Sequence, residues 1–287
     1  MRSTSMAAAL LATGLAFPSL AAAQTMRTDS SFDSDGVRIR YVVQGSGPPV
    51  LLIHGFMVST ELNWGPAGVI DSLASRYRVI ALDLRGHGAS DKPHDPGAYG
   101  HAFVDDVVRL LDHLDIPRVH VIGYSMGGAI ALNLLTAHPD RVASAVLGGF
   151  AWRSPELGPS EIVMQVQAAL ERISRGEITF AEALAGPGGV DLPPPMRAAL
   201  NSNDVTALMA VLSGNAELLA IPEADLRAGT TPVLAIVGEL DPERSGVERM
   251  ADIMPHLETE VIAGATHVDA AFHPLFLQAV VRFLASQ

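Results

Sequence analysis

The residues best suited to chemistry are a serine, an aspartate and a histidine far apart in the chain. Ser125 lies in the string GYSMGG (123–128), Asp241 in GELDPE and His267 in GATHVD. A serine hydroxyl is a weak nucleophile until a base takes its proton, and that base needs a third group to hold its tautomer. The three residue types therefore predict nucleophilic catalysis, with Ser125 as nucleophile, His267 as base and Asp241 as orienting acid.

These three residues each follow a short apolar run that is typical of a buried strand. The runs cover 49–55, 77–84, 119–123, 142–149, 232–238 and 259–264, and helical patterns are expected at 66–75, 102–114, 126–138, 245–253 and 274–285. Continuous apolar runs separated by helices predict a parallel sheet covered on both faces. The segment GVRIRYVVQGSGPP alternates after Asp35-Gly36, which predicts an antiparallel strand near an edge, entered through a tight turn.

The glycines around Ser125 have a steric role. Gly123 and Gly127 lie two places on either side of the serine, where side chains would collide in a sharp strand-to-helix turn. Glycine also tolerates strained dihedral angles, and Gly128 lets the helix pack closely. A G-x-S-x-G string arises often by chance in a chain with 26 glycines, so the surrounding elements carry the prediction.

One long interval contains no strand-like run. From 152 to 229 the sequence shows helix-period stretches such as SEIVMQVQAALERIS and DVTALMAVLSG, separated by GPGG and by three prolines. We expect a helical lid over the carboxyl edge of the sheet, where open α/β folds bind ligands. The apolar stripe Leu208, Met209, Val211 and Leu212 is read as lid core, with an acyl or alcohol pocket as the open alternative.

Taken together, four landmarks in order resemble the α/β-hydrolase fold family, over roughly residues 30–287. They are LLIHGF, ALDLRGHGASD, GYSMGG and THVDAAFHP. The resemblance implies an α/β fold with a mostly parallel central sheet flanked by helices and a small helical lid inserted after strand 6. The core domain would comprise 24–151 and 230–287, and the lid 152–229.

The same resemblance implies an oxyanion hole and narrows the choice of acid. The backbone N–H groups of Phe56 and Met126 would stabilise the oxyanion, with His54-Gly55 shaping the loop. Glu239 competes with Asp241, whereas the position after the sixth strand, where some relatives carry the acid, reads Gly148-Gly149-Phe150 and offers no carboxylate.

The remaining polar candidates receive structural interpretations. Asp83 is expected to fix the RGHGAS loop by hydrogen bonds, as aspartates do in turns. No H-E-x-x-H or comparable cluster suggests a metal site. Most other histidines are expected in loops or on helix surfaces, and His273 just before a helix; the former are His87, His94, His101, His113, His120, His138 and His256.

Composition limits the partners and the compartment. The formal charge is −12 and Lys92 is the one lysine, which argues against nucleic acid. Arg2, the apolar run 6–17 and Ala21-Ala22-Ala23 predict a signal peptide over 1–23, cut before Gln24, and hence a periplasmic or secreted protein. The chain has no cysteine, which excludes disulfides and a lipid-anchored cysteine, so no stable membrane anchor is expected.

The sequence thus predicts an exported serine hydrolase that cleaves carboxylic esters or related acyl compounds through an acyl-enzyme on Ser125. Its partner would be a small-molecule substrate, no cofactor or metal is expected, and the oligomeric state stays open. Other enzymes of this fold remain alternatives: a cofactor-free perhydrolase or haloperoxidase, a C–C bond hydrolase, or a hydroxynitrile lyase. A non-catalytic ligand-binding module is the alternative of another class. Haloalkane dehalogenases and epoxide hydrolases of this fold carry an aspartate where this chain has Ser125. The serine therefore argues against both of these activities.

Overall fold

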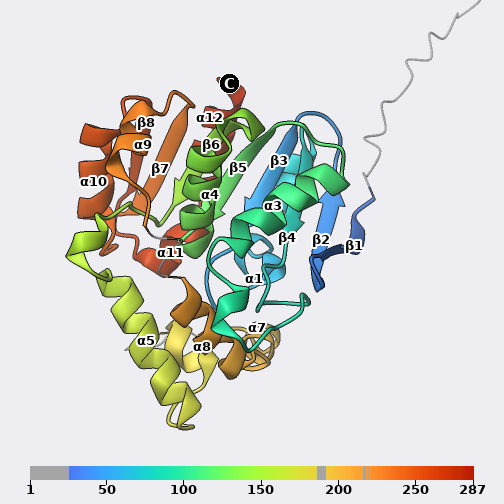
Figure 1. The fold of residues 1–287 in the computed structure, drawn as a ribbon, viewed down its shortest axis with the longest axis vertical. Coiled ribbons are helices and arrows are strands. Elements are labelled where there is room, and N and C mark those ends of the chain that lie inside the picture. Colours follow the sequence, from blue (N-terminus) through green and yellow to red (C-terminus); the bar gives the residue numbers. More distant parts are fainter. Residues whose placement is uncertain (1–25, 186–191, 216–217, 219) are drawn as a thin grey trace, which may run out of the picture.

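The computed structural model describes residues 26–185, 192–215, 218 and 220–287, so the expected signal peptide lies outside the described residues. A sheet of eight strands forms the centre of the described part (Figure 1). The strands are β1 (Thr28–Ser34), β2 (Val37–Gln44), β3 (Pro49–Ile53), β4 (Arg78–Leu82), β5 (Val119–Tyr124), β6 (Val142–Gly148), β7 (Val233–Gly238) and β8 (Leu257–Ile262).

The strand order places the loops that carry Ser125, Asp241 and His267 at one edge of the sheet. The order is β1-β2-β4-β3-β5-β6-β7-β8; β1 and β2 run antiparallel to their neighbours, and from β4 to β8 all pairings are parallel. The mostly parallel sheet predicted from the apolar runs is confirmed. Because parallel strands end at the same edge, the loops after β3, β5, β7 and β8 meet there.

Helices cover both faces of the sheet and explain the unbroken apolar runs. The core helices are α1 (Thr60–Trp64), α2 (Val69–Ala74), α3 (Ala102–His113), α4 (Met126–Ala137), α10 (Arg244–Ile253), α11 (His267–Phe272) and α12 (Pro274–Ala285). In β3, Leu51 and Ile53 pack with α3, α4 and α10, whereas Val50 and Leu52 pack with α1, α2, α11 and α12. Successive residues of a strand point to opposite faces, so a strand covered on both sides is apolar at every position.

The edge strand β1 and the short helix α1 were not delimited by the sequence. The segment Thr28–Ser34 is polar, and Phe32 and Ser34 are its two buried side chains. Its pairing with β2 through a turn in which Asp35 and Gly36 have φ of 57° and 81° confirms the tight turn. One prediction was wrong: His120 lies within β5, where Ser144 of β6 contacts its Nδ1 at 2.8 Å, and not in a loop or on a helix surface.

The segment from 152 to 229 is helical where the structure describes it. Its helices are α5 (Glu161–Ser174), α6 (Phe180–Ala185), α7 (Pro194–Asn201), α8 (Val205–Gly214) and α9 (Glu223–Ala228). Figure 1 shows α5, α7 and α8 together at one end of the sheet, with α5 projecting from the core. Leu170, Phe180, Leu200 and Leu208 form a cluster of their own with Met57 of the core. These lid helices therefore have an apolar interior that includes the loop after β3.

The junction between β5 and α4 is closed by backbone contacts that admit no side chain. A Cβ atom on Gly123 would lie 2.1 Å from the carbonyl oxygen of Gly127, and one on Gly127 would lie 2.1 Å from the carbonyl oxygen of Ile53. Real Cβ atoms do not approach backbone so closely, so any side chain at either position forces the backbone to shift. The steric reason expected for these two glycines is present in the fold.

We predict that Gly123→Ala lowers the free energy of unfolding by about 3 kcal/mol, because its methyl group has no space. Gly229→Ala is the matched control, since Gly229 has a φ of −63° and a Cβ atom added there would lie 3.4 Å from its nearest neighbour, the carbonyl oxygen of Leu226. We expect that control to change stability by less than about 0.5 kcal/mol. Guanidinium unfolding measures both, and equal stabilities of the two variants would contradict the steric argument.

Candidate active site

The structure brings the serine, the histidine and the aspartate into one chain of hydrogen bonds. Ser125 joins β5 to α4, Asp241 follows β7, and His267 is the first residue of α11 after β8. His267 Nδ1 lies 2.9 Å from Oδ2 of Asp241, and His267 Nε2 lies 3.0 Å from Oγ of Ser125. A carboxylate only accepts, so Nδ1–H donates to Asp241 and leaves Nε2 to accept the serine proton.

The backbone at Ser125 is strained. Its φ is 52° and its ψ is −117°, outside the regions that residues with a side chain normally occupy. Such a conformation costs about 1–3 kcal/mol and persists only where the surroundings fix it. The packing of Gly123 and Gly127 supplies that constraint, and the turn holds the hydroxyl between the end of a strand and the start of a helix.

Asp241 is buried and hydrogen-bonded, whereas Glu239, the alternative acid, contacts other groups. Asp241 is 4% exposed, and its Oδ1 accepts a hydrogen bond of 2.9 Å from the backbone N–H of Glu243. Glu239 instead accepts from the backbone N–H of Gly264 at 2.8 Å and lies 4.0 Å from Arg244. Of the two candidate acids, Asp241 is therefore the one that contacts the histidine.

The loop after β3 lies directly against the nucleophile turn. A Cβ atom on Gly55 would lie 3.3 Å from the carbonyl oxygen of Tyr124 and 3.4 Å from Cβ of Ser125. Phe56 follows Gly55 in the chain, and Met126 follows Ser125 as the first residue of α4. The two amides expected to form an oxyanion hole thus belong to segments that border the serine from opposite sides.

Neighbouring side chains hold this loop in place. Asn63 Oδ1 accepts from the backbone N–H of Gly55 at 2.9 Å. His54 donates from Nδ1 to the carbonyl oxygen of Gly55 at 2.7 Å and accepts from the backbone N–H of Leu84 at 3.0 Å. Burial lowers the pKa of His54, and the neutral ring is the form that can make both bonds. His54 therefore organises the loop, as expected.

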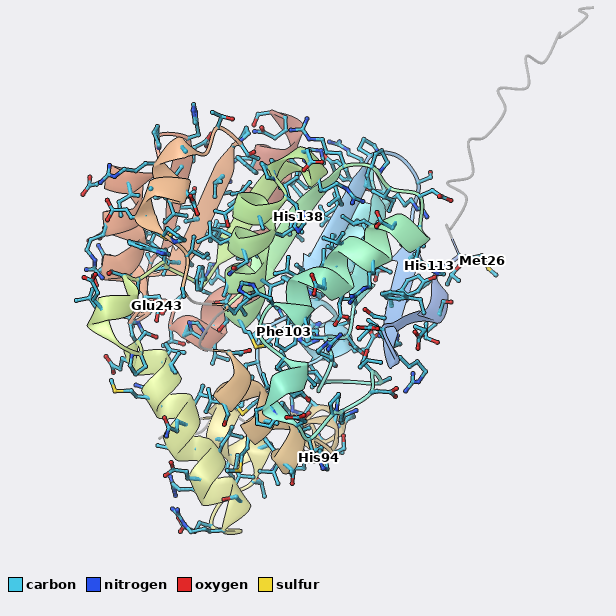
Figure 2. The ribbon with its side chains drawn as sticks, viewed as in Figure 1. Met26, His94, Phe103, His113, His138 and Glu243 are labelled. Carbon is cyan, nitrogen blue, oxygen red and sulfur yellow. The ribbon has the colours of Figure 1, made fainter. Side chains whose placement is uncertain are left out.

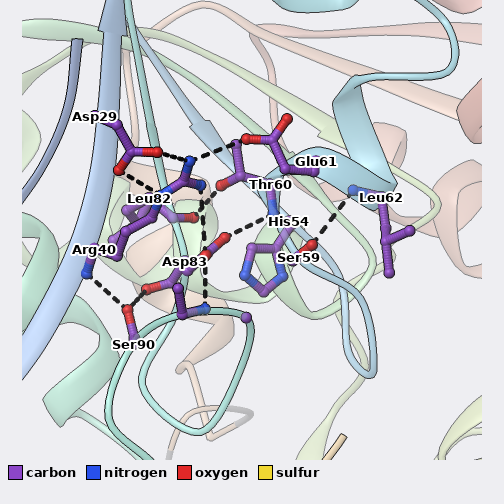
Figure 3. A network of polar contacts seen from close by, with 12 residues as sticks. Asp29, Arg40, His54, Ser59, Thr60, Glu61, Leu62, Leu82, Asp83 and Ser90 are labelled. Atoms are coloured by element: carbon purple, nitrogen blue, oxygen red, sulfur yellow. Dashed lines mark hydrogen bonds and ion pairs between the residues drawn. The ribbon is translucent and has the colours of Figure 1, made fainter. Parts of the chain in front are cut away.

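Asp83 joins the same region to the rest of the sheet (Figure 3). Its carboxylate accepts from the backbone N–H groups of Thr60 at 2.8 Å and Ala89 at 2.9 Å, and from Arg40 at 3.5 Å. Arg40 also binds Asp29 of β1, and Asp83 is 2% exposed. The expectation that Asp83 fixes the RGHGAS loop agrees with these contacts, which extend further to α1 and to the edge strands.

His87 lies in that loop, as one of the two predicted locations had it, but it is fully buried and not at the surface. It donates from Nδ1 to the carbonyl oxygen of Arg85 at 3.1 Å, and its ring packs 5.5 Å from the ring of Phe56. Burial, together with the nearby His54, lowers its pKa to about 3. His87 is therefore neutral at ordinary pH and is a poor candidate for a general base.

The segment 152–229 contacts the loop after β3 through a hydrogen bond and an apolar cluster. Asn203 donates to the carbonyl oxygen of Met57 at 2.8 Å, and Met57 has a φ of 64°. Of the apolar stripe, Leu208 is buried beside Met57 and Leu212 is partly buried against the same cluster. Met209 is 42% exposed, so the stripe is divided between the lid interior and the surface. Asn203 carried no signal in the sequence.

A second contact ties the lid to the acid loop. Ser160 caps the N-terminus of α5 and hydrogen-bonds the carboxylate of Glu243, two residues beyond Asp241. Glu243 is labelled in Figure 2. Burial raises the pKa of Glu243; the hydrogen bond from Ser160 and the nearby His267 and Arg153 oppose that rise. Glu243 is thus a second carboxyl group beside the catalytic residues that sequence reasoning did not single out.

A hollow of about 760 Å³ lies beside the loop after β3, and Arg40, Ser59, Glu61, Lys92 and Asn203 are among its lining residues. None of the three triad residues is among them. Its acidic side chains, Asp29, Glu61 and Asp83, form ion pairs with Arg40. This hollow is therefore polar, and it lies between the segment 152–229 and the edge of the sheet.

Within the residues that the structure describes, no group of three or more histidines and carboxylates is arranged to hold a metal ion. Among the same residues, no helix has the length and apolar character needed to cross a bilayer.

Comparison with known proteins identifies the family. The sequence profile described as the alpha/beta hydrolase fold matches residues 48–274. The chain belongs to the alpha/beta hydrolase fold family, as the four landmark motifs predicted.

Individual relatives differ in how much of the chain they match. An uncharacterized protein of Mycobacterium tuberculosis is 30% identical over 276 residues, covering 87% of this chain and 79% of its own. An acetyltransferase component of the acetoin cleaving system of Cupriavidus necator is 38% identical over 155 residues; the match covers 53% of this chain and 40% of that relative. A crystal structure of a bacterial membrane phospholipase A is similar with a TM-score of 0.70 at 27% identity, over 91% of this chain and 86% of its own. Family and structural neighbours together support a hydrolase.

We predict that His87 makes the protein sensitive to acid. Its pKa is 6.5 in the unfolded chain and about 3 in the folded one, so between these values the unfolded state binds one more proton. The stabilisation is complete above pH 6.5 and falls by about 1.4 kcal/mol per pH unit on acidification. In His87→Gln the slope of unfolding free energy against pH between 6 and 4 should be shallower by that amount.

Chemical unfolding at several pH values measures this slope. The control is His101→Gln, because His101 is exposed and its ring stays in water in both states. That control should keep the wild-type slope. An unchanged slope in His87→Gln would show that the buried ring does not govern acid sensitivity.

Proposed function

We propose that the protein hydrolyses carboxylic esters through an acyl-enzyme formed on Ser125. The observation that carries this proposal is the hydrogen-bond chain from Asp241 through His267 to Ser125, with separations of 2.9 and 3.0 Å. These lengths are within the range in which a base can take the nucleophile's proton. The chain is assembled at a strained turn, and the loop after β3 packs against that turn, where backbone amides could stabilise the oxyanion of acyl transfer.

The reaction proceeds in two halves. Ser125 Oγ attacks the ester carbonyl while His267 Nε2 takes its proton, and Asp241 stabilises the imidazolium that forms. The amides of Phe56 and Met126 donate to the oxyanion, and His267 returns its proton to the leaving alcohol. A water molecule activated by His267 then attacks the acyl-enzyme and releases the acid.

The surroundings favour an uncharged substrate. The lid cluster that borders the oxyanion loop is apolar and includes Phe180, Leu200 and Leu208. A structure similar to this chain is described as a membrane phospholipase A, which supports a hydrolytic function.

We predict that Ser125→Ala abolishes turnover of p-nitrophenyl butyrate and covalent labelling by a fluorophosphonate probe. Loss of the nucleophile should reduce kcat by about ten-thousand-fold or more, while the fold is retained because only one oxygen is removed. Intact-protein mass spectrometry after probe treatment measures the labelling.

Ser75→Ala is the control, because Ser75 is exposed at the end of α2 and its hydroxyl bonds the carbonyl oxygen of Ser72. It should label and turn over like the wild type. A wild-type protein that is folded yet unreactive toward the probe and a panel of esters would favour a ligand-binding role instead.

We also propose that the protein is exported and matures by cleavage between Ala23 and Gln24. The support is the pattern of a basic residue, an apolar run of 12 residues and a small-residue site in 1–23. Expression of the full chain in a bacterial host, followed by fractionation and N-terminal sequencing, should yield a periplasmic or secreted protein beginning at Gln24. A full-length protein retained in the cytoplasm would overturn this proposal.

A further inference from the structure

We infer that Tyr124 is a positioning residue for His267, and this inference rests on the proposed function. Tyr124 immediately precedes the nucleophile, and its hydroxyl donates a hydrogen bond of 2.5 Å to the backbone carbonyl oxygen of His267. The residue adjoining the nucleophile is thereby bonded to the backbone of the base. One side chain connects two catalytic loops that are 142 positions apart in the sequence.

The hydroxyl contacts both ends of one helical turn. Besides the carbonyl oxygen of His267, it meets the backbone N–H of Ala271, four residues further along α11. Burial raises the pKa of Tyr124 well above its usual value, so the hydroxyl keeps its proton and remains a donor. Thr266 caps the same turn through a hydrogen bond from Asp269, so this first turn is held from two sides.

The ring of Tyr124 has little freedom to move. A Cβ atom on Gly148 would lie 2.7 Å from its Cδ2, and one on Gly149 would lie 2.9 Å from its Cζ. Its centroid is 5.7 Å from both the Phe276 ring, edge to face, and the imidazole of His267. Gly148 at the end of β6 and Gly149 after it, where the sequence offered no carboxylate, therefore make room for this ring.

This arrangement acts on the distance that matters for proton transfer. The separation of His267 Nε2 from Ser125 Oγ depends on where the backbone of His267 lies relative to β5, and Tyr124 bonds that backbone from β5 itself. A shift of about 1 Å in a catalytic group can cost about a hundredfold in rate. Loss of the hydroxyl should therefore slow the chemical step, while substrate binding, which uses the lid, is spared.

The test is Tyr124→Phe, which removes one oxygen and keeps the ring. We expect kcat for p-nitrophenyl butyrate to fall about tenfold with KM within twofold of wild type, and the rate of fluorophosphonate labelling to fall in parallel. Tyr99→Phe is the matched control, because Tyr99 is also buried and donates a 2.5 Å bond to a backbone carbonyl, that of Pro93. This control should keep the wild-type kcat.

A second variant perturbs the hydrogen bond from Tyr124 to His267 without removing the hydroxyl. In Gly148→Ala the added methyl group would press on Tyr124 and Phe276, so we expect the same fall in kcat at unchanged KM. If either variant keeps kcat within twofold of wild type, or if Tyr99→Phe loses as much as Tyr124→Phe, the positioning role is wrong. Wild-type protein without labelling or esterase activity would instead overturn the proposed function.

Discussion

The nucleophile depends on the close contact between the turn that carries Ser125 and the loop that follows β3. Gly127 lies so near the carbonyl oxygen of Ile53 that a single carbon atom would not fit between them. This contact holds Ser125 at a φ of 52°, and it brings Gly55 against the serine at the same time. One packed backbone interface therefore holds both the strained Ser125 and the loop after β3, because strain persists only where its surroundings fix it.

The loop after β3 is held from its outer side by buried polar groups. Asp83 accepts two backbone N–H groups and an ion pair from Arg40, while Asn63 and His54 bond Gly55 directly. Buried charges of this kind add little to stability on their own, but removing one partner leaves the other unpaired at high cost. The network therefore restricts the loop to one conformation, and it extends through Arg40 to the edge strand β1.

The lid contributes to the same loop from a third direction. Asn203 binds the carbonyl oxygen of Met57, and Ser160 binds Glu243 beside the catalytic aspartate. Both contacts join the segment 152–229 to the loops beside Ser125, Asp241 and His267. His94, labelled in Figure 2, lies 2.8 Å from Asp204 at the start of α8 and joins the same segment to the loop after β4.

The sequence by itself determined the elements that local chemistry controls. Apolar runs specified the parallel strands β3 to β7 because both faces of those strands are covered, and the glycines of GYSMGG indicated a turn without room for side chains. A sixth run also predicted β8, although this edge strand has one buried residue, Ile262. The order of Ser125, Asp241 and His267 after successive strands was enough to expect them together. Polar β1 was missed because an edge strand is defined by its pairing with β2 and buries few side chains.

Only the tertiary structure decided which polar groups meet. Asp241 and Glu239 are equally suitable by type, and the direction of the chain after β7 selects Asp241 for the histidine. His87 is of a residue type common on surfaces, and it is buried because the rings of His54 and Phe56 pack against it. The Tyr124 bond to His267 and the Asn203 bond to Met57 join residues more than 100 positions apart. Spacing along the chain carries no information about such contacts, because they depend on how separate elements pack in three dimensions.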